Sequence, residues 1–244
     1  MKPFLLVATR AEDVAADAEY AAFCRYGGLE PEQLHRVRLE QGPLPAVDLD
    51  DYSGVLVGGG PFNSSDPAEQ KSPVQRRVES ELAGLLDQIV ARDFPFLGAC
   101  YGVGTLGAHQ GAVIDGTFGE PVGPIEVELT PDAAADPLLA GLPQTFAAYV
   151  GHKEAVRKLP DGAVLLASSA ECPVQMFRIK QNLYATQFHP ELDVEGIVQR
   201  IAVYRDYGYF PPEEAELVRE RCVAVPIVEP MRILRAFVVR YARE

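Results

Sequence analysis

Several residue types that mark functional classes are rare in this sequence. It contains no tryptophan, three methionines, four histidines and four cysteines among 244 residues. The cysteines form no Cys-x-x-Cys pair, so their spacing predicts neither a zinc motif nor a thioredoxin-like pair; they are Cys24, Cys100, Cys172 and Cys222. We therefore expect free thiols in a cytoplasmic protein that needs no metal and no cofactor.

Long hydrophobic runs and basic clusters are also absent. No apolar stretch approaches the ~20 residues that span a bilayer, and the apolar run at residues 4–8 is too short for a signal peptide. The formal net charge is -13, which argues against nucleic acid as a partner. Hydrophobic residues make up 48% of the chain, enough for a sizeable core. The composition thus predicts a globular protein that binds neither membrane nor nucleic acid.

Short apolar runs alternate with helical patterns along the first part of the chain. Strands are predicted at residues 4–9, 34–39, 54–57 and 95–99, and helices at residues 13–26, 74–92 and 101–110. Strands that alternate with helices favour crossover units. The pattern therefore predicts an α/β fold with a mainly parallel open sheet flanked by helices.

The second half of the chain has a different pattern. Between residues 119 and 184 it is rich in β segments and tight turns, which is typical of antiparallel pairing. After Pro190 it becomes helical, with predicted helices at residues 194–207, 213–223 and 231–243. We expect a main domain over residues 1–192 that contains a small antiparallel section. Residues 193–244 are predicted to form a helical extension packed on the same domain.

The first candidate for chemistry is Cys100, in the Gly-Ala-Cys-Tyr-Gly segment of residues 98–102. It lies between a predicted buried strand and a predicted helix, the setting of a nucleophile elbow. A cysteine at a helix N-terminus also meets the positive end of the helix dipole, which favours the reactive thiolate. By itself, this motif leaves a structural cysteine in a glycine-rich turn as the commoner alternative.

The second candidate is the Gln-Phe-His-Pro-Glu segment of residues 187–191, which follows another predicted strand. Glu191 lies two residues beyond His189, where a carboxylate can hold the tautomer of the imidazole. The carboxyl ends of parallel strands share one edge of a sheet. We therefore predict that Cys100, His189 and Glu191 meet there as nucleophile, base and orienting carboxylate.

The two segments together resemble the motifs of class I glutamine amidotransferases, most closely the glutaminase domain of GMP synthase and its stand-alone relatives. Gly59-Gly60-Pro61 is similar to the oxyanion loop of that family, and residues 151–156 resemble its Ser-His-x-Asp-x-Val segment. The resemblance runs from the first strand to Glu191. It implies a flavodoxin-like sheet and a glutamine amidotransferase catalytic domain over residues 1–192.

The resemblance also implies roles for the three candidate residues. Cys100 would attack the side-chain amide of glutamine, and His189, oriented by Glu191, would protonate the departing ammonia and then activate water. Two positions depart from the family pattern. Gly104 stands where the family has a glutamine that seats the substrate, and Gly151 replaces a serine. The loss of such polar contacts favours an altered substrate preference.

Further residues are expected to contact the substrate because of the same resemblance. The amides of Gly60 and Tyr101 would form an oxyanion hole, and Gly59, beside Gly60 on the oxyanion loop, would also contact the substrate or its oxyanion. The backbone around Lys153 and Glu154 would hold the amino-acid end of the substrate.

Family members usually pass their ammonia to a synthetase, and the sequence contains no P-loop signature for one. We therefore expect a glutaminase that supplies an acceptor or a partner synthetase on another chain. One alternative is a hydrolase of γ-glutamyl peptides or similar amides, which Gly104 and Gly151 favour. The other is a catalytically silent binding or regulatory module. The complete set of Cys100, His189 and Glu191 argues against that module.

Overall fold

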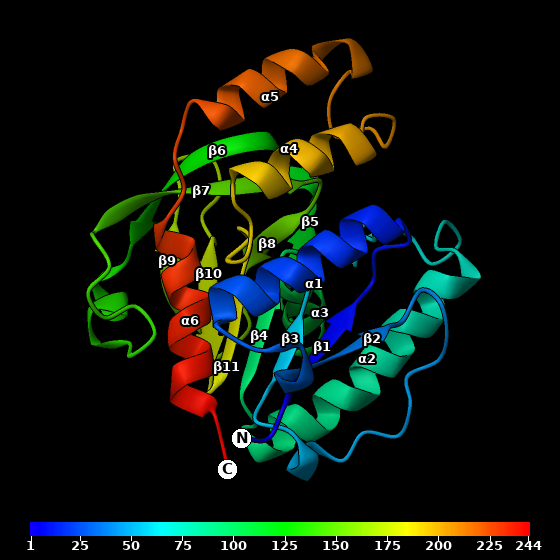
Figure 1. Cartoon of the computed structure of the whole chain (residues 1–244), viewed down its shortest axis with the longest axis vertical. Coiled ribbons are helices and arrows are strands. Elements are labelled where there is room, and N and C mark those ends of the chain that lie inside the picture. Colours follow the sequence, from blue (N-terminus) through cyan, green and yellow to red (C-terminus); the bar gives the residue numbers. More distant parts are fainter.

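The computed structural model describes residues 1–244 and is built around a nine-stranded sheet with helices on both faces (Figure 1). One half of the sheet is parallel and contains, in spatial order, β2 (Leu34–Arg38), β1 (Phe4–Ala8), β3 (Val55–Val57), β4 (Phe96–Ala99) and β11 (Leu183–Thr186). The antiparallel half continues with β10 (Met176–Ile179), β9 (Val164–Ser168), β6 (Glu120–Leu129) and β7 (Thr145–His152). A separate ribbon pairs β5 (Val113–Asp115) with β8 (Ala155–Lys158).

The helices cover the two faces of the parallel half, because its strands are apolar on both sides. On β1, Phe4 and Leu6 face the core shared with α1 (Asp13–Gly27) and α6 (Glu229–Tyr241). Leu5 and Val7 belong to the opposite core, which is shared with α2 (Pro73–Arg92) and α3 (Tyr101–His109). The predicted α/β fold with a parallel sheet flanked by helices is therefore confirmed.

The antiparallel half differs in detail from the prediction. It joins the main sheet through the pairing of β10 with β11, and it includes β7, which the sequence pattern did not reveal. The predicted helix at residues 194–207 is shorter, because α4 (Val194–Val203) is followed by turns in which Gly208 adopts a φ of 73°. A short helix, α5 (Ala215–Val223), then packs against α4 and β6.

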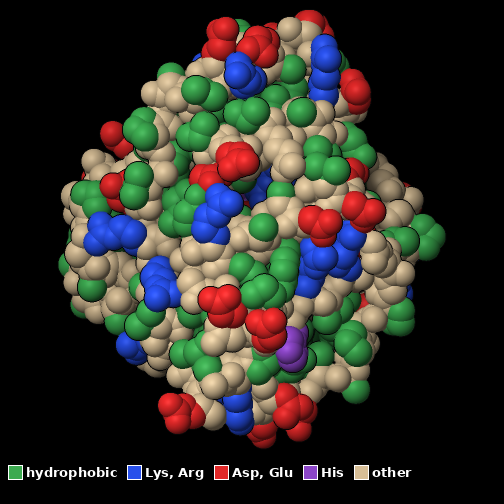
Figure 2. Space-filling view, viewed as in Figure 1, with side chains coloured by type: hydrophobic (Ala, Val, Ile, Leu, Met, Phe, Trp, Pro, Cys, Tyr) green, Lys and Arg blue, Asp and Glu red, His purple; other side chains and the backbone are tan.

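The last helix returns to the main core. The Phe237 ring of α6 lies 6.1 Å, between centroids, from the Phe4 ring of β1. The two chain ends lie side by side (Figure 1), and the Lys2 amide donates a 2.7 Å hydrogen bond to the Arg243 carbonyl. None of the helices combines the length and the apolar character needed to cross a membrane. On the face over α1 and α6, acidic and basic side chains are interspersed, so the net charge of -13 is not gathered into one patch there (Figure 2).

Candidate active site

Cys100 occupies a strained corner between β4 and α3. Its backbone has a φ of 51° and a ψ of -92°, a region that residues with a side chain rarely adopt. The Cys100 amide donates a 2.8 Å hydrogen bond to the Thr186 carbonyl of β11, which fixes the corner to the sheet. A Cβ added at Gly98 would lie 2.8 Å from Gly102 Cα, so this tight turn requires glycine. These features are those of the predicted nucleophile elbow.

The predicted histidine and carboxylate meet just beyond the end of β11. His189 Nδ1 lies 2.8 Å from Glu191 Oε1, and an ionised carboxylate only accepts hydrogen bonds. Nδ1 must therefore carry the proton, which leaves Nε2 as the basic nitrogen. Cys100 and His189 line the same cavity, although no hydrogen bond joins their side chains. The structure thus brings the three residues together. The hydrogen bond between Cys100 and His189 that proton transfer requires would have to form when the substrate binds.

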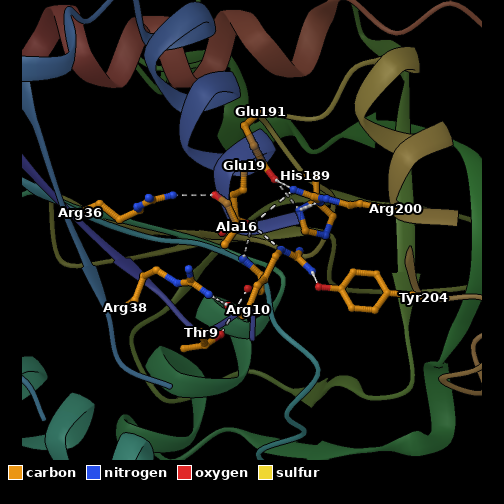
Figure 3. A network of polar contacts seen from close by, with 11 residues as sticks. Thr9, Arg10, Ala16, Glu19, Arg36, Arg38, His189, Glu191, Arg200 and Tyr204 are labelled. Carbon is orange, nitrogen blue, oxygen red and sulfur yellow. Dashed lines mark hydrogen bonds and ion pairs between the residues drawn. The ribbon is translucent and has the colours of Figure 1, made fainter. Parts of the chain in front are cut away.

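A buried ionic network that the sequence analysis missed surrounds this pair (Figure 3). Arg200 of α4 donates through Nη2 to Glu191 Oε1 at 2.8 Å and to Glu19 Oε1 at 3.3 Å. Arg10, which follows β1, donates through Nε to the same Glu19 oxygen at 2.9 Å. All four side chains are buried, and two guanidinium groups balance two carboxylates. Such balance is required because an uncompensated buried charge is strongly destabilising.

Arg200 also approaches His189, with Nη1 at 3.0 Å from Nδ1. Since Nδ1 already carries the proton that it donates to Glu191, this approach is a contact between two donors and not a hydrogen bond. Two positive groups in contact disfavour protonation of the imidazole. Arg200 therefore orients Glu191, and its charge adds to the burial that disfavours protonation of His189.

The network leaves a detectable signal in the sequence. Glu19 lies four residues after Ala15 and four before Phe23, and all three are buried on the same face of α1. Arg200 likewise shares the buried face of α4 with Ile197 and Ile201. A charged residue at an apolar helical position is rarely buried unless it is paired. This periodicity indicates a buried ion pair, but it does not identify the partners.

The environment sets the protonation of the three candidate residues. Burial raises the pKa of the Cys100 thiol to about 11, against the attraction of Arg10 and Arg200. This direction is opposite to the thiolate-favouring one that was predicted from the helix N-terminus. Burial also lowers the pKa of His189 below its usual value. For Glu191, burial is outweighed by the charges and hydrogen bonds of His189 and Arg200, which hold its pKa well below the usual range. The resting pair is therefore a neutral thiol and a neutral imidazole.

These shifts predict that the protein loses stability on acidification. The folded-state pKa values of His189 and Glu191 lie below their unfolded values of about 6.5 and 4.3. The unfolded chain then binds more protons, so the free energy of unfolding falls as the pH drops below about 6.5. Urea midpoints at about pH 7.5 and about pH 5.5 measure the effect. His189→Gln should lose part of this decline and His35→Gln, at an exposed position, should keep it. Equal declines in both variants would contradict the assignment.

The expected oxyanion residues divide into two kinds. The Gly60 and Tyr101 amides make no hydrogen bond within the chain, and both residues line a cavity beside Cys100. Gly59 differs from the prediction, because its amide donates to Glu19 Oε1 at 3.2 Å and is not free for a substrate. A Cβ at Gly59 would lie 2.6 Å from His189 Cε1, so its role is to let the imidazole pack closely.

The expected substrate residues border this cavity, which Lys153, Glu154, Gly104 and Gly151 line together with Cys100. The carboxylate of Glu154 is occupied by the backbone of the loop after β3, since it accepts 2.7 Å hydrogen bonds from the amides of Ser64 and Ser65. The Lys153 ammonium donates a 2.8 Å hydrogen bond to the Tyr207 carbonyl. A Cβ at Gly104 would lie 2.5 Å from Ser64 Oγ and 2.9 Å from Glu154 Oε1. The space that a side chain at position 104 would enter is therefore already filled.

Comparison with known proteins agrees with this geometry. Residues 31–197 match the model of the family described as "Glutamine amidotransferase class-I". A relative in Thermoplasma volcanium, named as one subunit of a glutamine-hydrolyzing GMP synthase, is 30% identical over 146 residues. That match covers 59% of this chain and 65% of the relative, so the chain spans just under two thirds of the relative's length.

Two solved structures have the same fold. A glutamine amidotransferase from Thermotoga maritima superposes with a TM-score of 0.78 at 21% identity, covering 99% of this chain and 98% of the other. A glutamine amido transferase from Methylobacillus flagellatus gives a TM-score of 0.72 at 19% identity, covering 100% and 97%. At these identities the likeness concerns the fold alone. The family match covers more than half of the residues, and the chain therefore belongs to the class I glutamine amidotransferases.

Proposed function

We propose that this protein hydrolyses the side-chain amide of glutamine through a thioester on Cys100. His189 Nε2 takes the thiol proton as Sγ attacks the amide carbon, and the oxyanion that forms lies between the Gly60 and Tyr101 amides. His189 returns the proton to the nitrogen as the C–N bond breaks and ammonia leaves. Water then attacks the thioester with His189 as base, which releases glutamate and restores the thiol. Glu191 positions the imidazole throughout.

The observation that supports this proposal most directly is the placement of Cys100. A cysteine at a strained elbow shares a cavity with a histidine whose Nδ1 is held by a buried carboxylate, and two amides without partners border the same cysteine. A neutral thiol beside a neutral imidazole fits base-assisted attack. In such a mechanism the thiolate forms only when substrate is present to accept it.

We also propose that the ammonia is delivered to an acceptor bound to a separate synthetase chain. The Thermoplasma relative is named as one component of a glutamine-hydrolysing synthase, which supports this division of labour. We assign residues 1–192 to the catalytic domain and residues 193–244 to an extension packed on it. Arg200 belongs to that extension and bonds Glu191, so the extension would complete the site as well as cover it.

Two assays test the proposed chemistry. Purified protein is incubated with glutamine, and ammonia and glutamate release are measured beside a Cys100→Ala variant. We expect turnover that the variant lacks. A diazo-ketone analogue of glutamine should label Cys100, as peptide mass spectrometry would show. Labelling of Cys24, Cys172 or Cys222 with Cys100 untouched would refute the nucleophile assignment.

One observation favours a second candidate, a γ-glutamyl amide hydrolase with the same nucleophile. The cavity that Cys100 shares with His189 is lined mostly by apolar and aromatic side chains, among them Leu192, Ile201, Tyr209 and Phe210, and Glu154 is not part of its lining. A substituent on the amide nitrogen of such a substrate would pack against these apolar side chains, whereas the unsubstituted amide of glutamine has no group that needs this cavity. Turnover of γ-glutamyl dipeptides at a higher kcat/KM than glutamine would favour this candidate.

Position 104 provides a further prediction. Gly104→Gln restores the family residue but forces its Cβ against Ser64 Oγ and Glu154 Oε1. We expect kcat/KM for glutamine to fall by roughly tenfold, since overpacking costs about 1–3 kcal/mol. The double variant Gly104→Gln with Ser64→Gly should recover part of the loss. If Gly104→Gln alone raises kcat/KM, the cavity does not hold the Ser64 contact in solution.

A further inference from the structure

A second cluster of reactive side chains lies beside the substrate cavity, which one of its members, His152, also lines. It consists of Glu120 at the start of β6, His152 at the end of β7, and Cys172 between β9 and β10. All three are at most 5% exposed. One atom from each of them, an oxygen, a nitrogen and a sulfur, lies within 4.8 Å of the other two. The mechanism proposed above uses none of them.

The ring of His152 is oriented as a metal ligand would be. Its Nδ1 lies 2.9 Å from the Glu154 carbonyl, which only accepts, so this nitrogen carries a proton. Nε2 points at Glu120 Oε2 from 2.8 Å. Metal-bound histidines characteristically donate their other ring N–H to a carbonyl or carboxylate in this way.

The carboxylate of Glu120 is supported in a similar manner. Gln175 Nε2 donates to Glu120 Oε2 at 2.6 Å and to Ser169 Oγ at 3.0 Å. Hydrogen bonds of this kind hold a ligating carboxylate in place. Gln175 Oε1 is buried and has no partner, so the cluster retains an unused polar atom.

An acidic mouth connects the cluster to solvent. A cavity of about 320 Å³ is lined by Ser169 and four glutamates, which are Glu120, Glu126, Glu128 and Glu171. Glu120 thus belongs both to the buried cluster and to the opening above it. A concave surface of one charge raises the local concentration of the opposite ion. This path would draw in cations and exclude anions.

We propose that Glu120, His152 and Cys172 form a binding site for a divalent transition metal ion, with Zn²⁺ as the best fit. One thiolate, one imidazole and one carboxylate suit zinc, at about 2.3 Å from sulfur and about 2.0–2.1 Å from nitrogen and oxygen. Binding displaces the proton between His152 Nε2 and Glu120 Oε2, and also the Cys172 thiol proton. Both protons pass to solvent, and water fills the fourth position.

The site would act on the neighbouring cavity through the short segment that follows His152. The Glu154 carbonyl accepts from His152, while the Glu154 carboxylate holds the amides of Ser64 and Ser65. A metal on His152 would therefore fix the wall of the cavity that Cys100 lines. This inference does not depend on the proposed reaction, because the ligands lie outside the catalytic set.

Cobalt titration of the full chain tests the site, since Co²⁺ replaces Zn²⁺ and reports its ligands by absorption. The titration uses a Cys100→Ala variant, so that Cys100 and His189 cannot bind the cobalt together. We expect one Co²⁺ per chain, a near-ultraviolet band from thiolate-to-cobalt charge transfer, and bleaching of that band by Zn²⁺. Cys172→Ala in this background should lose the band. Glu120→Gln should weaken binding by more than about 10-fold, because it removes a ligand and not only a residue that supports one. Cys24→Ala, at a half-buried cysteine away from the cluster, should keep it.

Several outcomes would overturn the proposal. One is the absence of a charge-transfer band in the Cys100→Ala protein. Another is a band that keeps its full strength when Cys172→Ala is added. A Zn²⁺-induced rise in Tm that is equal in the Glu120→Gln and parent proteins would count equally against it. The first outcome needs no cluster variant, so misfolding of a variant cannot hide a failure.

Discussion

Replacing Arg200 by methionine is expected to lower the free energy of unfolding by about 3–5 kcal/mol, because it leaves the buried carboxylate of Glu191 without a guanidinium partner. Arg200 is the only group that bonds both Glu191 and Glu19, and its side chain is 9% exposed. Such a loss is a large share of the stability of an ordinary domain. Glutamine turnover should fall as well, by roughly 10²-fold, since Glu191 loses the partner that orients it. Urea unfolding and steady-state kinetics measure the two effects.

A second substitution separates charge balance from loss of packing. Glu191→Gln in the Arg200→Met background removes the carboxylate that has lost its guanidinium, whereas Glu19 keeps its bond to Arg10. The double variant should therefore be more stable than Arg200→Met alone. Arg219→Met, at a solvent-exposed pair with Glu216, should change stability by no more than about 1 kcal/mol. If the two losses at Arg200 and Glu191 simply add, the network does not act as a charge-balanced unit.

Gly98→Ala is expected to disrupt the nucleophile corner. The new Cβ would meet the Cα, C and O atoms of Gly102 at 2.8, 2.9 and 3.0 Å, and backbone atoms cannot rotate aside. The corner would have to open, which shifts Cys100 relative to His189. We expect about 1–3 kcal/mol of lost stability and a loss of roughly 10²-fold in kcat, because misplacement of about 1 Å has that effect. Unfolding curves and glutaminase assays provide the two readings.

The matched control is Gly84→Ala, at an exposed position in α2 where an added Cβ meets nothing within 4 Å. There the substitution should stabilise the helix by up to about 1 kcal/mol. The pair therefore compares one chemical change in two environments. Wild-type kcat in Gly98→Ala would show that the corner tolerates the clash, contrary to the argument above.

The sequence predicted the parts of the fold that depend on local pattern. The strands β1, β3 and β4 are recognisable as short continuous apolar runs because each is buried on both faces. The helices after them are recognisable from the period of their apolar positions. β7 was not predicted because its apolar segment, Phe146–Val150, is followed by Gly151 and His152, which interrupt a strand pattern. Its place in the sheet comes from pairing with β6, a contact that residues distant in sequence make.

The candidate site was predictable where neighbouring residues in the sequence determine the position of a functional group. Cys100 on its elbow and Glu191 two residues from His189 are local features, and the structure brings them together. The network that joins Arg10 and Arg200 was not predictable, because its link from Arg200 to Glu19 connects residues 181 positions apart. The thiol protonation was missed for a related reason. The burial that outweighs the helix dipole exists only once these elements have assembled.

The positive φ of Cys100 makes cysteine a costly residue at this position. A positive φ of 51° favours glycine, which adopts it freely, over any residue that carries a Cβ. A sequence optimised for thermal stability alone would therefore have glycine at this corner, and the site would have no thiol. Under the proposed mechanism, the cysteine at this corner is a trade-off in which conformational ease is given up for a nucleophile.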